Sequence, residues 1–587
     1  MPLPPLPPLL PPVSRTFRRL EIRLSLLLVV LSASAVPMRA AAAQAVEAYA
    51  ERAVVTTGHP EASAVALDVL RQGGNAVDAA VAAAFALAAV LPDAGNVGGG
   101  GFLVLRRADG TATAWDFRET APLAATRDLF LGPDGLPVAG RSTAGHLAVG
   151  VPGTVAGLVA AHAADGRLPL ARVVEPAVRL ARGHVLTARA ASLLNRYRPD
   201  FARFDASAAL FVRDAPWQAG DVFENPDLAA TLGRIRDRGH DGFYRGETAR
   251  LLAEEMARGG GLITLADLAA YRAVEREPLR GAYRGYRLAT MPPPSSGGIA
   301  LLQTLAALEP YPVATWGSQS PRALHVLGEA LRRAFADRAR YAGDPAWARV
   351  PVAGLVDPAY VAARMATFDP GRATLSADVL AGVPAGAPEP TETTHLSVVD
   401  ADGAAVALTT TLNDYFGARV VVAGAGFLLN DEMDDFATAP GLPNAWGLVQ
   451  GEANAVAPGR RMASSMTPVI VEDAAGRLFA ACGSPGGPRI ISTVAQVLLG
   501  VIDDRLGVQA AAARPRVHHQ WLPDVLYAEA GLPAETLDAL RGIGWAVEPT
   551  DRFGAANCVV VRTASDGTRT LTASADPRRP DDDARGY

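Results

Sequence analysis

The run Glu392-Thr393-Thr394-His395-Leu396-Ser397-Val398-Val399-Asp400 is typical of a threonine placed to become a new amino terminus at the start of a strand. A threonine hydroxyl is a poor nucleophile unless a base lies beside it. Cleavage between Glu392 and Thr393 frees an α-amine, which titrates at about 7.7–8.0 and can accept a proton at neutral pH. One cut then supplies both nucleophile and base. Taken alone, the run also fits an ordinary threonine-rich strand.

The residues around this threonine predict a β-hairpin. Hydrophobic alternation predicts strands over 394–399 and 404–413, with a turn between them. The register that opposes like side chains uses a three-residue loop and pairs Leu396 with Leu408, Val398 with Val406 and Thr393 with Thr411. We therefore expect the Thr411 hydroxyl beside Thr393, with Asn413 just beyond it.

The first residues of the chain have the pattern of an export signal. Four arginines between Arg15 and Arg23 precede the apolar run Leu24 to Val36, and small residues follow as far as Ala43. The apolar run is shorter than the roughly 20 residues that a membrane span needs. We therefore expect residues 1–43 to be a signal peptide and the protein to be periplasmic or secreted. An uncleaved N-terminal anchor is the alternative.

Charge argues against nucleic acid or an anionic membrane surface as a partner. The formal net charge is −5, and residues 1–43 carry five arginines and one glutamate, so removing them leaves about −9. The sequence contains no lysine, which excludes chemistry that needs a lysine amine.

Cysteine and histidine usage predicts neither a disulfide framework nor a metal site. Cys482 and Cys558 each lie in an apolar, strand-like run, so we expect two buried thiols rather than a pair. The adjacent His518 and His519 would point to opposite faces of a strand and would chelate a metal poorly. We expect no metal and no organic cofactor.

The pattern along the chain is first mixed and then β-rich. Periodicity predicts helices over 60–73, 76–90, 251–258, 265–271, 321–342 and 358–365, and a strand over 102–105. Residues 381–391 are rich in Gly, Pro, Ala and Glu and predict the exposed loop that a processing site needs. After Thr393 the pattern favours strands as far as Cys482, then a helix over 491–502 and further strands.

Several polar segments lie at the ends of apolar runs. They are Asp116-Phe117-Arg118-Glu119, the acidic run 430–436 with Glu432 and Asp435, the run 460–468 with Ser464 and Ser465, and the run 483–489 with Gly486 and Gly487. An arginine can bind a carboxylate with two parallel hydrogen bonds. A Gly-Gly turn at a helix start offers free N–H groups to an oxyanion. Taken singly, each segment also fits a loop, a turn or a surface ion pair.

Together these segments resemble the γ-glutamyltranspeptidase (glutathione hydrolase) family, in the family's order, from about Glu51 to Tyr587. Further matching blocks are Gly98 to Phe102, Gly150 to Thr154, Met291 to Gly298, Thr393-Thr394-His395 and Asp576-Pro577-Arg578. The resemblance implies an N-terminal-nucleophile hydrolase of α+β class with a four-layer αββα sandwich. It also implies a precursor that cuts itself before Thr393. The large subunit, residues 44–392, and the small catalytic subunit, residues 393–587, then stay together as a heterodimer.

The resemblance also implies roles for individual residues. Thr393 is the implied nucleophile, Thr411 positions it, and the N–H groups of Gly486 and Gly487 form the oxyanion hole. The implied donors are glutathione and other γ-glutamyl compounds, and the acceptors are water, amino acids or dipeptides. The groups implied to hold the donor are Glu432 and Asp435 at its ammonium, Arg118, Ser464 and Ser465 at its α-carboxylate, and Asn413 at the same α-amino acid end.

Two features leave alternatives open. The stretch 440–456 fits a lid over a small-peptide pocket, with Trp446 as its closing aromatic, although Trp446 also fits a core position.

On the same fold, an acylase that removes glutaryl or cephalosporin side chains is the alternative enzyme. Arg118 with Glu432 and Asp435 disfavours it, because a glutaryl group has no ammonium. A non-catalytic binding protein is the alternative from another class.

Overall fold

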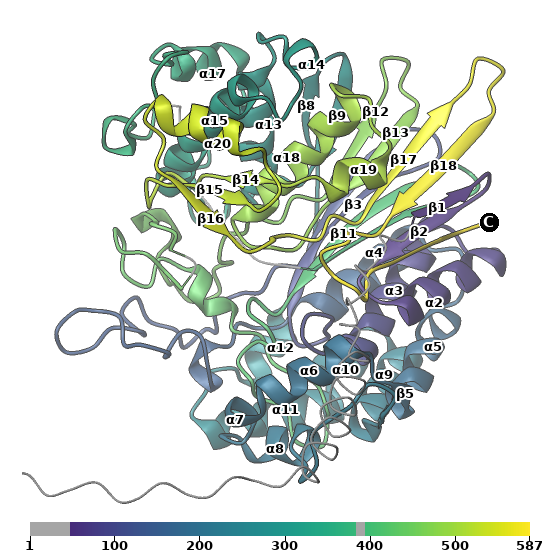
Figure 1. The fold of residues 1–587 in the computed structure, drawn as a ribbon. Helices are drawn as coiled ribbons and strands as arrows, with labels where there is room; N and C mark the ends of the chain where they lie inside the picture. Colours follow the sequence, from purple (N-terminus) through teal and green to yellow (C-terminus); the bar gives the residue numbers. More distant parts are fainter. Residues whose placement is uncertain (1–46, 383–393, 446) are drawn as a thin grey trace, which may run out of the picture. The chain divides into compact units, whose positions relative to one another are not determined.

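The computed structural model describes residues 47–382, 394–445 and 447–587, whose helices and strands are drawn in Figure 1. These residues form two seven-stranded antiparallel sheets. The first sheet has the order β1 (Glu47–Ala50), β18 (Arg569–Ser574), β17 (Cys558–Thr563), β13 (Leu478–Cys482), β12 (Val469–Glu472), β9 (Tyr286–Thr290) and β8 (Leu279–Tyr283). The second has the order β19 (Asp583–Gly586), β2 (Val54–Thr57), β10 (Thr394–Val399), β11 (Ala405–Thr411), β3 (Gly100–Arg106), β4 (Ala112–Asp116) and β7 (Val274–Arg276).

The two sheets pack face to face, and helices cover the outer face of each. One buried cluster joins Phe102 and Val399 of the second sheet to Ile470 and Val559 of the first. The second sheet packs outward against α2 (Pro60–Arg71), α3 (Ala76–Val90) and α4 (Thr154–Asp165), and α5 (Leu170–Arg182) and α9 (Pro226–Arg238) extend the same apolar cluster behind them. The first packs outward against α13 (Gly297–Leu308) and α19 (Val508–Ala513), and α15 (Pro321–Tyr341), α18 (Arg489–Ile502) and α20 (Ala534–Gly542) belong to the same apolar cluster. The fold is therefore the expected α+β, four-layer αββα sandwich.

Helix α3 supports the predicted hairpin from behind. Asn75 and Asp78 form a capping box at its start, and all of its side chains are buried. The helix packs on β10 and β11, whose outward-facing Leu396 and Leu408 belong to the same apolar cluster as the helix. Because side chains alternate along a strand, Val399 faces the other sheet instead. The hairpin is thus held between two apolar layers.

The chain between the two β-hairpins of the C-terminal part is less regular than predicted. The sequence favoured strands from Thr393 to Cys482, but only β10, β11, β12 and β13 form there among the described residues. From residue 412 to 468 the described chain makes turns, isolated bridges and two 3₁₀ segments, Glu432–Asp435 and Glu452–Asn454. Positive backbone φ angles at Asn413, Phe416 and Arg419 interrupt any extended run. This irregular stretch carries several of the candidate site residues.

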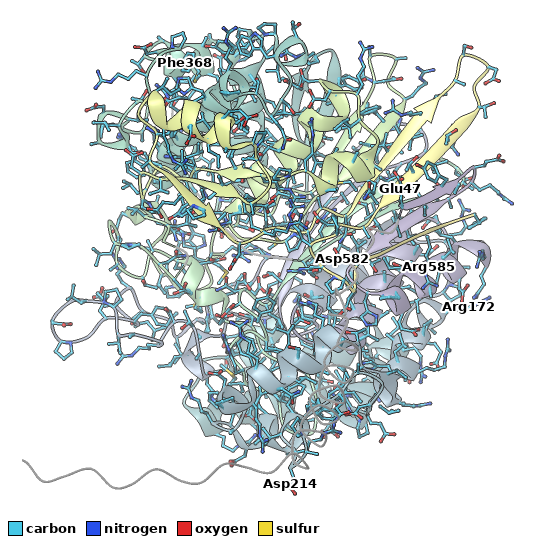
Figure 2. The ribbon with its side chains drawn as sticks, in the orientation of Figure 1. Glu47, Arg172, Asp214, Phe368, Asp582 and Arg585 are labelled. Carbon is cyan, nitrogen blue, oxygen red and sulfur yellow. A yellow bond between two sulfur atoms is a disulfide. The ribbon has the colours of Figure 1, made fainter. Side chains whose placement is uncertain are left out.

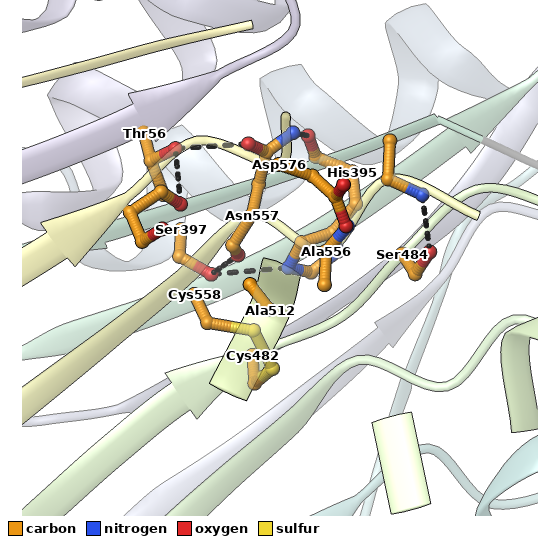
Figure 3. The surroundings of a disulfide bond; sticks show 12 residues. Thr56, His395, Ser397, Cys482, Ser484, Ala512, Ala556, Asn557, Cys558 and Asp576 are labelled. Carbon is orange, nitrogen blue, oxygen red and sulfur yellow. Dashed lines mark hydrogen bonds between the residues drawn. A yellow bond between two sulfur atoms is a disulfide. The ribbon is translucent and has the colours of Figure 1, made fainter. Parts of the chain in front are cut away.

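Cys482 and Cys558 form a disulfide, so the expectation of two buried thiols was wrong. They lie on β13 and β17, which are neighbouring antiparallel strands paired through Ala480–Val560 and Ala481–Val559. The sequence shows that each cysteine lies in a strand but not that the strands are neighbours in this register. Figure 3 shows the bond next to Asn557 and Ser397. Because both cysteines follow Thr393, the bond does not cross the predicted cleavage site.

We predict that replacing both cysteines with alanine lowers the free energy of unfolding by about 2–5 kcal/mol. The bond joins residues 76 positions apart, so it removes much chain entropy from the unfolded state. Urea unfolding with and without reductant measures the effect, and the double variant should match the reduced parent protein. Equal stability of variant and oxidised parent would contradict the prediction.

Three predicted segments fall where the structure is not described: the signal peptide over 1–43, most of the tether over 381–391, and Glu392 with Thr393. Within the described ranges, no helix has both the length and the apolar character that crossing a membrane requires.

Candidate functional site

The hairpin that follows the predicted nucleophile has the predicted register. β10 and β11 pair Thr394 with Thr410, Leu396 with Leu408 and Val398 with Val406. Glu392 and Thr393 lie outside the described residues, so the pairing of Thr393 with Thr411 stays a prediction.

His395 contributes to packing and is not exposed to a cavity. Its ring nitrogens lie 3.0 Å from Thr409 Oγ1 and 3.0 Å from Ser397 Oγ, and Ser397 Oγ donates to the Asn557 carbonyl at 2.9 Å. Burial lowers the pKa of His395 to about 3, so the ring is neutral. The Asn557 side chain also donates to Asp582, which is labelled in Figure 2. Burial raises the pKa of Asp582 to about 8. This network joins β10 to the loop before β17.

Thr411 and Asn413 end the second strand of the hairpin. Thr411 Oγ1 accepts a hydrogen bond from the Asn413 N–H at 2.7 Å and lies 3.4 Å from Glu432 Oε1. Asn413 has a φ of 78°, a conformation that asparagine tolerates better than most residues, and its side chain donates to the Asp431 carbonyl at 3.0 Å. The threonine hydroxyl is therefore linked directly to the acidic segment.

Arg118 lies at the centre of a fully buried cluster of charges. It pairs with Glu432 and with Asp435, and its Nη1 lies 3.6 Å from Glu119. The guanidinium also donates to the carbonyls of Met462 at 3.1 Å and Ala463 at 2.9 Å. All four charged side chains are completely shielded from solvent. Arg118, which was expected to bind the substrate's α-carboxylate, thus pairs in this structure with Glu432 and Asp435, which were expected to bind its ammonium.

Burial and the neighbouring charges shift the pKa values of the groups in this cluster in opposite directions. Burial raises the pKa of Glu119 to about 8 and the pKa of Glu432 well above its usual range, while the charge of Arg118 opposes both shifts. Burial also lowers the pKa of Arg118, but the carboxylates Glu432, Asp435 and Glu119 outweigh it and raise that pKa overall. One guanidinium thus faces three carboxyl groups, and burial favours the neutral form of Glu119 and Glu432.

Ser464 and Ser465 continue the segment that holds Arg118. Ser464 Oγ accepts from the Met466 N–H at 3.2 Å, and the Ser464 carbonyl accepts from Ser296 Oγ at 2.7 Å. Ser465 Oγ accepts from Arg338 at 3.1 Å. Both serines are buried. The two serines therefore directly follow Met462 and Ala463, the residues whose carbonyls bind Arg118.

Gly486 and Gly487 precede α18 in conformations that favour glycine, with φ angles of 130° and 62°. Their carbonyls accept from the N–H groups of Arg489 and Ile490 in the first turn of the helix. Among the described residues, no group accepts a hydrogen bond from the N–H of either glycine. Two such free donors at a helix start are suited to holding a developing negative charge.

A cavity of about 350 Å³ brings Thr411, Asn413 and Gly486 to one surface. The Arg118 cluster and the two serines do not line it, and lie deeper in the protein. The contact of Thr411 with Glu432 connects the cavity to the buried cluster.

Asn430 belongs to the acidic run 430–436, but the sequence did not reveal that its side chain connects this run to two glycine-containing segments. Its side chain donates to the carbonyls of Gly98 and Gly150, both at 2.8 Å, and accepts from the N–H groups of Gly150 and Glu432. A Cβ on Gly98 would lie 2.1 Å from the Leu428 carbonyl oxygen, so only glycine fits this approach. The glycine blocks at 98–102 and 150–154 thus help to place Glu432.

The expected lid stretch packs on the acidic segment. The N–H of Ala445 donates to Asp434 at 3.2 Å, and the Asn454 side chain donates to the Asp435 carbonyl at 2.7 Å. Trp446 lies outside the described residues, so its closing role stays a prediction.

Comparisons with known proteins agree on one family. The family model described as gamma-glutamyltranspeptidase matches residues 62–586. The chain is 44% identical to the glutathione hydrolase proenzyme of Escherichia coli, covering 92% of each chain, and 39% identical to the Acylase ACY 1 proenzyme of Pseudomonas sp. strain SE83, covering 90% and 92%. The structure of a cephalosporin acylase from Bacillus halodurans matches with a TM-score of 0.80 at 25% identity over 92% of this chain and 97% of that one. This chain therefore belongs to the γ-glutamyltranspeptidase family.

Proposed function

We propose that this protein is an autoprocessed γ-glutamyltransferase and glutathione hydrolase. The observation that carries the proposal is the buried cluster of Arg118, Glu432 and Asp435, joined through Thr411 to a cavity that Gly486 also lines. A γ-glutamyl donor carries an ammonium and a carboxylate on one carbon, away from the amide that is cut. Bound here, its carboxylate takes Arg118 with Ser464 and Ser465, and its ammonium takes Glu432 and Asp435. Asn413 binds the same end of the donor.

The reaction follows from the position proposed for Thr393. Its hydroxyl oxygen bonds to the γ-carbonyl carbon, and its α-amine takes the hydroxyl proton. The N–H groups of Gly486 and Gly487 stabilise the oxyanion. The carbon–nitrogen bond then breaks, the leaving amine takes the proton, and a γ-glutamyl ester remains. Water or the amine of an acceptor attacks the ester and restores the threonine.

Processing uses the same hydroxyl within the chain. It attacks the Glu392 carbonyl, the carbon–nitrogen bond breaks to leave an ester and the free α-amine of Thr393, and water then hydrolyses the ester to give the Glu392 carboxylate and the Thr393 hydroxyl. The products are the large subunit, residues 44–392, and the small subunit, residues 393–587. We place the mature enzyme in the periplasm or outside the cell after removal of residues 1–43.

Strand pairing supports the proposal that both subunits stay together. β2 pairs with β10 and β19, and β3 pairs with β11. In the other sheet, β1 pairs with β18 and β9 pairs with β12. Each of these pairs has one strand before residue 382 and the other at or after residue 394, so separating the fragments would open both sheets and the core between them.

The proposal predicts strong selection for the donor's ammonium. We expect kcat/KM for γ-glutamyl-4-nitroanilide to exceed that for glutaryl-4-nitroanilide by roughly 10³-fold or more, because the glutaryl carboxylate would take Arg118 without bringing an ammonium to Glu432 and Asp435 in its place. Release of 4-nitroaniline measures both reactions. Equal or preferred cleavage of the glutaryl compound would support an acylase, and no cleavage of either would support a binding protein.

A further inference from the structure

The hydroxyl protons of Ser464 and Ser465 are available to a ligand. Ser464 Oγ accepts from the Met466 N–H at 3.2 Å, and Ser465 Oγ accepts from Arg338 Nη2 at 3.1 Å. Neither hydroxyl donates to an acceptor among the residues that the structure describes, and both side chains are fully buried. A serine hydroxyl has one proton and two lone pairs, so each oxygen accepts here and keeps its proton for another partner. Because a buried donor without an acceptor is costly, this arrangement points to a bound group that accepts both protons.

The segment that leads into α13 holds the backbone beneath these hydroxyls. The Pro294 carbonyl accepts from the Ser464 N–H at 3.0 Å. The Ser464 carbonyl accepts from the N–H of Ser296 at 2.8 Å and from its hydroxyl at 2.7 Å. A Cβ on Gly297 would lie 2.6 Å from the Ser465 carbonyl oxygen, so only glycine allows this approach. The backbone of the serine pair is therefore fixed, which is the preorganisation that a binding site needs.

Arg338 holds the Ser465 side chain from another element. It lies in the last turn of α15, is 6% exposed, and has its guanidinium carbon 5.6 Å from the centre of the Phe335 ring. An arginine side chain stays positively charged and can only donate hydrogen bonds. Because its N–H occupies one lone pair of Ser465 Oγ, the serine proton points away from the guanidinium. A charged donor also polarises the hydroxyl that it binds and makes that hydroxyl a better donor.

We propose that Arg338 is a positioning residue that sets selectivity for the donor's α-carboxylate through Ser465. This inference rests on the proposed function, in which Ser464 and Ser465 bind that carboxylate. Arg338 directs the Ser465 proton toward the ligand, and its charge strengthens a hydrogen bond to an anion more than one to a neutral amide. Arg338 precedes the proposed cleavage site and Ser465 follows it, so the large subunit tunes a donor site of the small subunit.

The test compares two donors that differ only at the α-carboxylate. They are γ-glutamyl-4-nitroanilide and the same compound with its α-carboxylate converted to a carboxamide, which keeps the ammonium. The enzymes are the parent protein, Arg338→Met, Ser465→Ala and the double variant, with Arg338→Lys as the milder change. Release of 4-nitroaniline gives kcat/KM for each donor, and a denaturing gel gives the fraction of cut chain to which each value is normalised.

Arg333→Met is the matched control. Arg333 is a buried arginine on the same helix that pairs with Glu329 and donates to the Arg364 carbonyl at 2.8 Å, not to Ser465. Its replacement should lower the free energy of unfolding, measured in urea, because Glu329 loses its partner. The preference for the carboxylate donor should stay within about twofold of that of the parent protein. If Arg333→Met loses this preference as far as Arg338→Met does, the effect of Arg338 is merely structural and the inference is wrong.

We expect the parent protein to prefer the carboxylate donor by roughly 10²-fold or more, and Arg338→Met to lower that preference about tenfold. Ser465→Ala should lower it at least as much. Adding Arg338→Met to Ser465→Ala should change it by less than about twofold, because Arg338 acts through that hydroxyl. Arg338→Lys should lie between the parent protein and Arg338→Met, and it carries the comparison if Arg338→Met is not cut.

Three results would overturn the inference alone. They are an unchanged preference in Arg338→Met, additive losses in the double variant, and a parent protein that cleaves both donors equally well. A parent protein that cleaves no γ-glutamyl substrate would overturn the proposed function and the inference with it.

Discussion

Replacing Thr393 with alanine is expected to leave one uncut polypeptide without measurable γ-glutamyl activity. The same hydroxyl is proposed to cut the chain and to attack the donor, so both reactions are lost together. Removal of an attacking group of this kind costs at least about 10³-fold in rate. Thr393→Ser keeps a hydroxyl and should cut itself slowly. Denaturing gels and intact-protein mass spectrometry measure processing, and release of 4-nitroaniline measures turnover.

Thr394→Val is the matched control for that variant. Thr394 begins β10 and is buried, and valine keeps its branched shape while removing its hydroxyl. The control should process and turn over substrate within about tenfold of the parent protein. If Thr394→Val abolishes cleavage while Thr393→Ala is still cut at the same bond, the nucleophile has been assigned to the wrong threonine.

Replacing Arg118 with leucine is expected to have the second largest effect. The variant leaves Glu432, Asp435 and Glu119 buried without their cation, which costs about 3–5 kcal/mol of stability. Donor binding also loses the group proposed to hold its α-carboxylate, so kcat/KM for γ-glutamyl-4-nitroanilide should fall by roughly 10³-fold or more. Arg118→Lys keeps the charge but not the two-pronged contact, and its kcat/KM should lie between those of the parent protein and Arg118→Leu.

The control for Arg118 separates stability from activity. Arg106 on β3 binds Glu472 on β12 at 2.7 Å and is nearly buried, but it does not contact the site. Arg106→Gln should lower the free energy of unfolding measured in urea and leave kcat/KM nearly unchanged. If Arg118→Leu lowers kcat/KM no more than Arg106→Gln does, Arg118 has only a structural role.

The hairpin, α3 and α17 (Pro358–Met365) show what the sequence could predict well. Helix α3 begins and ends where expected, since Asn75 and Asp78 cap it and an unbroken apolar run follows. The hairpin register also agrees, because only one register opposes like side chains on both faces. In both cases the information lies within a few neighbouring residues.

The features that the sequence did not reveal depend on contacts between distant segments. The Cys482–Cys558 bond requires that β13 and β17 are neighbours. The direct pairing of Arg118 with Glu432 joins residues 314 positions apart. The cavity beside Thr411 and Gly486 likewise combines loops around Arg552 and Arg579 with the end of β11. A single sequence identifies such groups by type but does not show which of them meet.

The most direct test of the account is N-terminal sequencing of the smaller fragment of purified, active enzyme, with the intact mass of both fragments. The account predicts two fragments, a smaller one that begins Thr393-Thr394-His395, and activity that rises in step with the fraction of cut chain. Full activity in an uncut chain, or a smaller fragment that begins at any other residue, would contradict it.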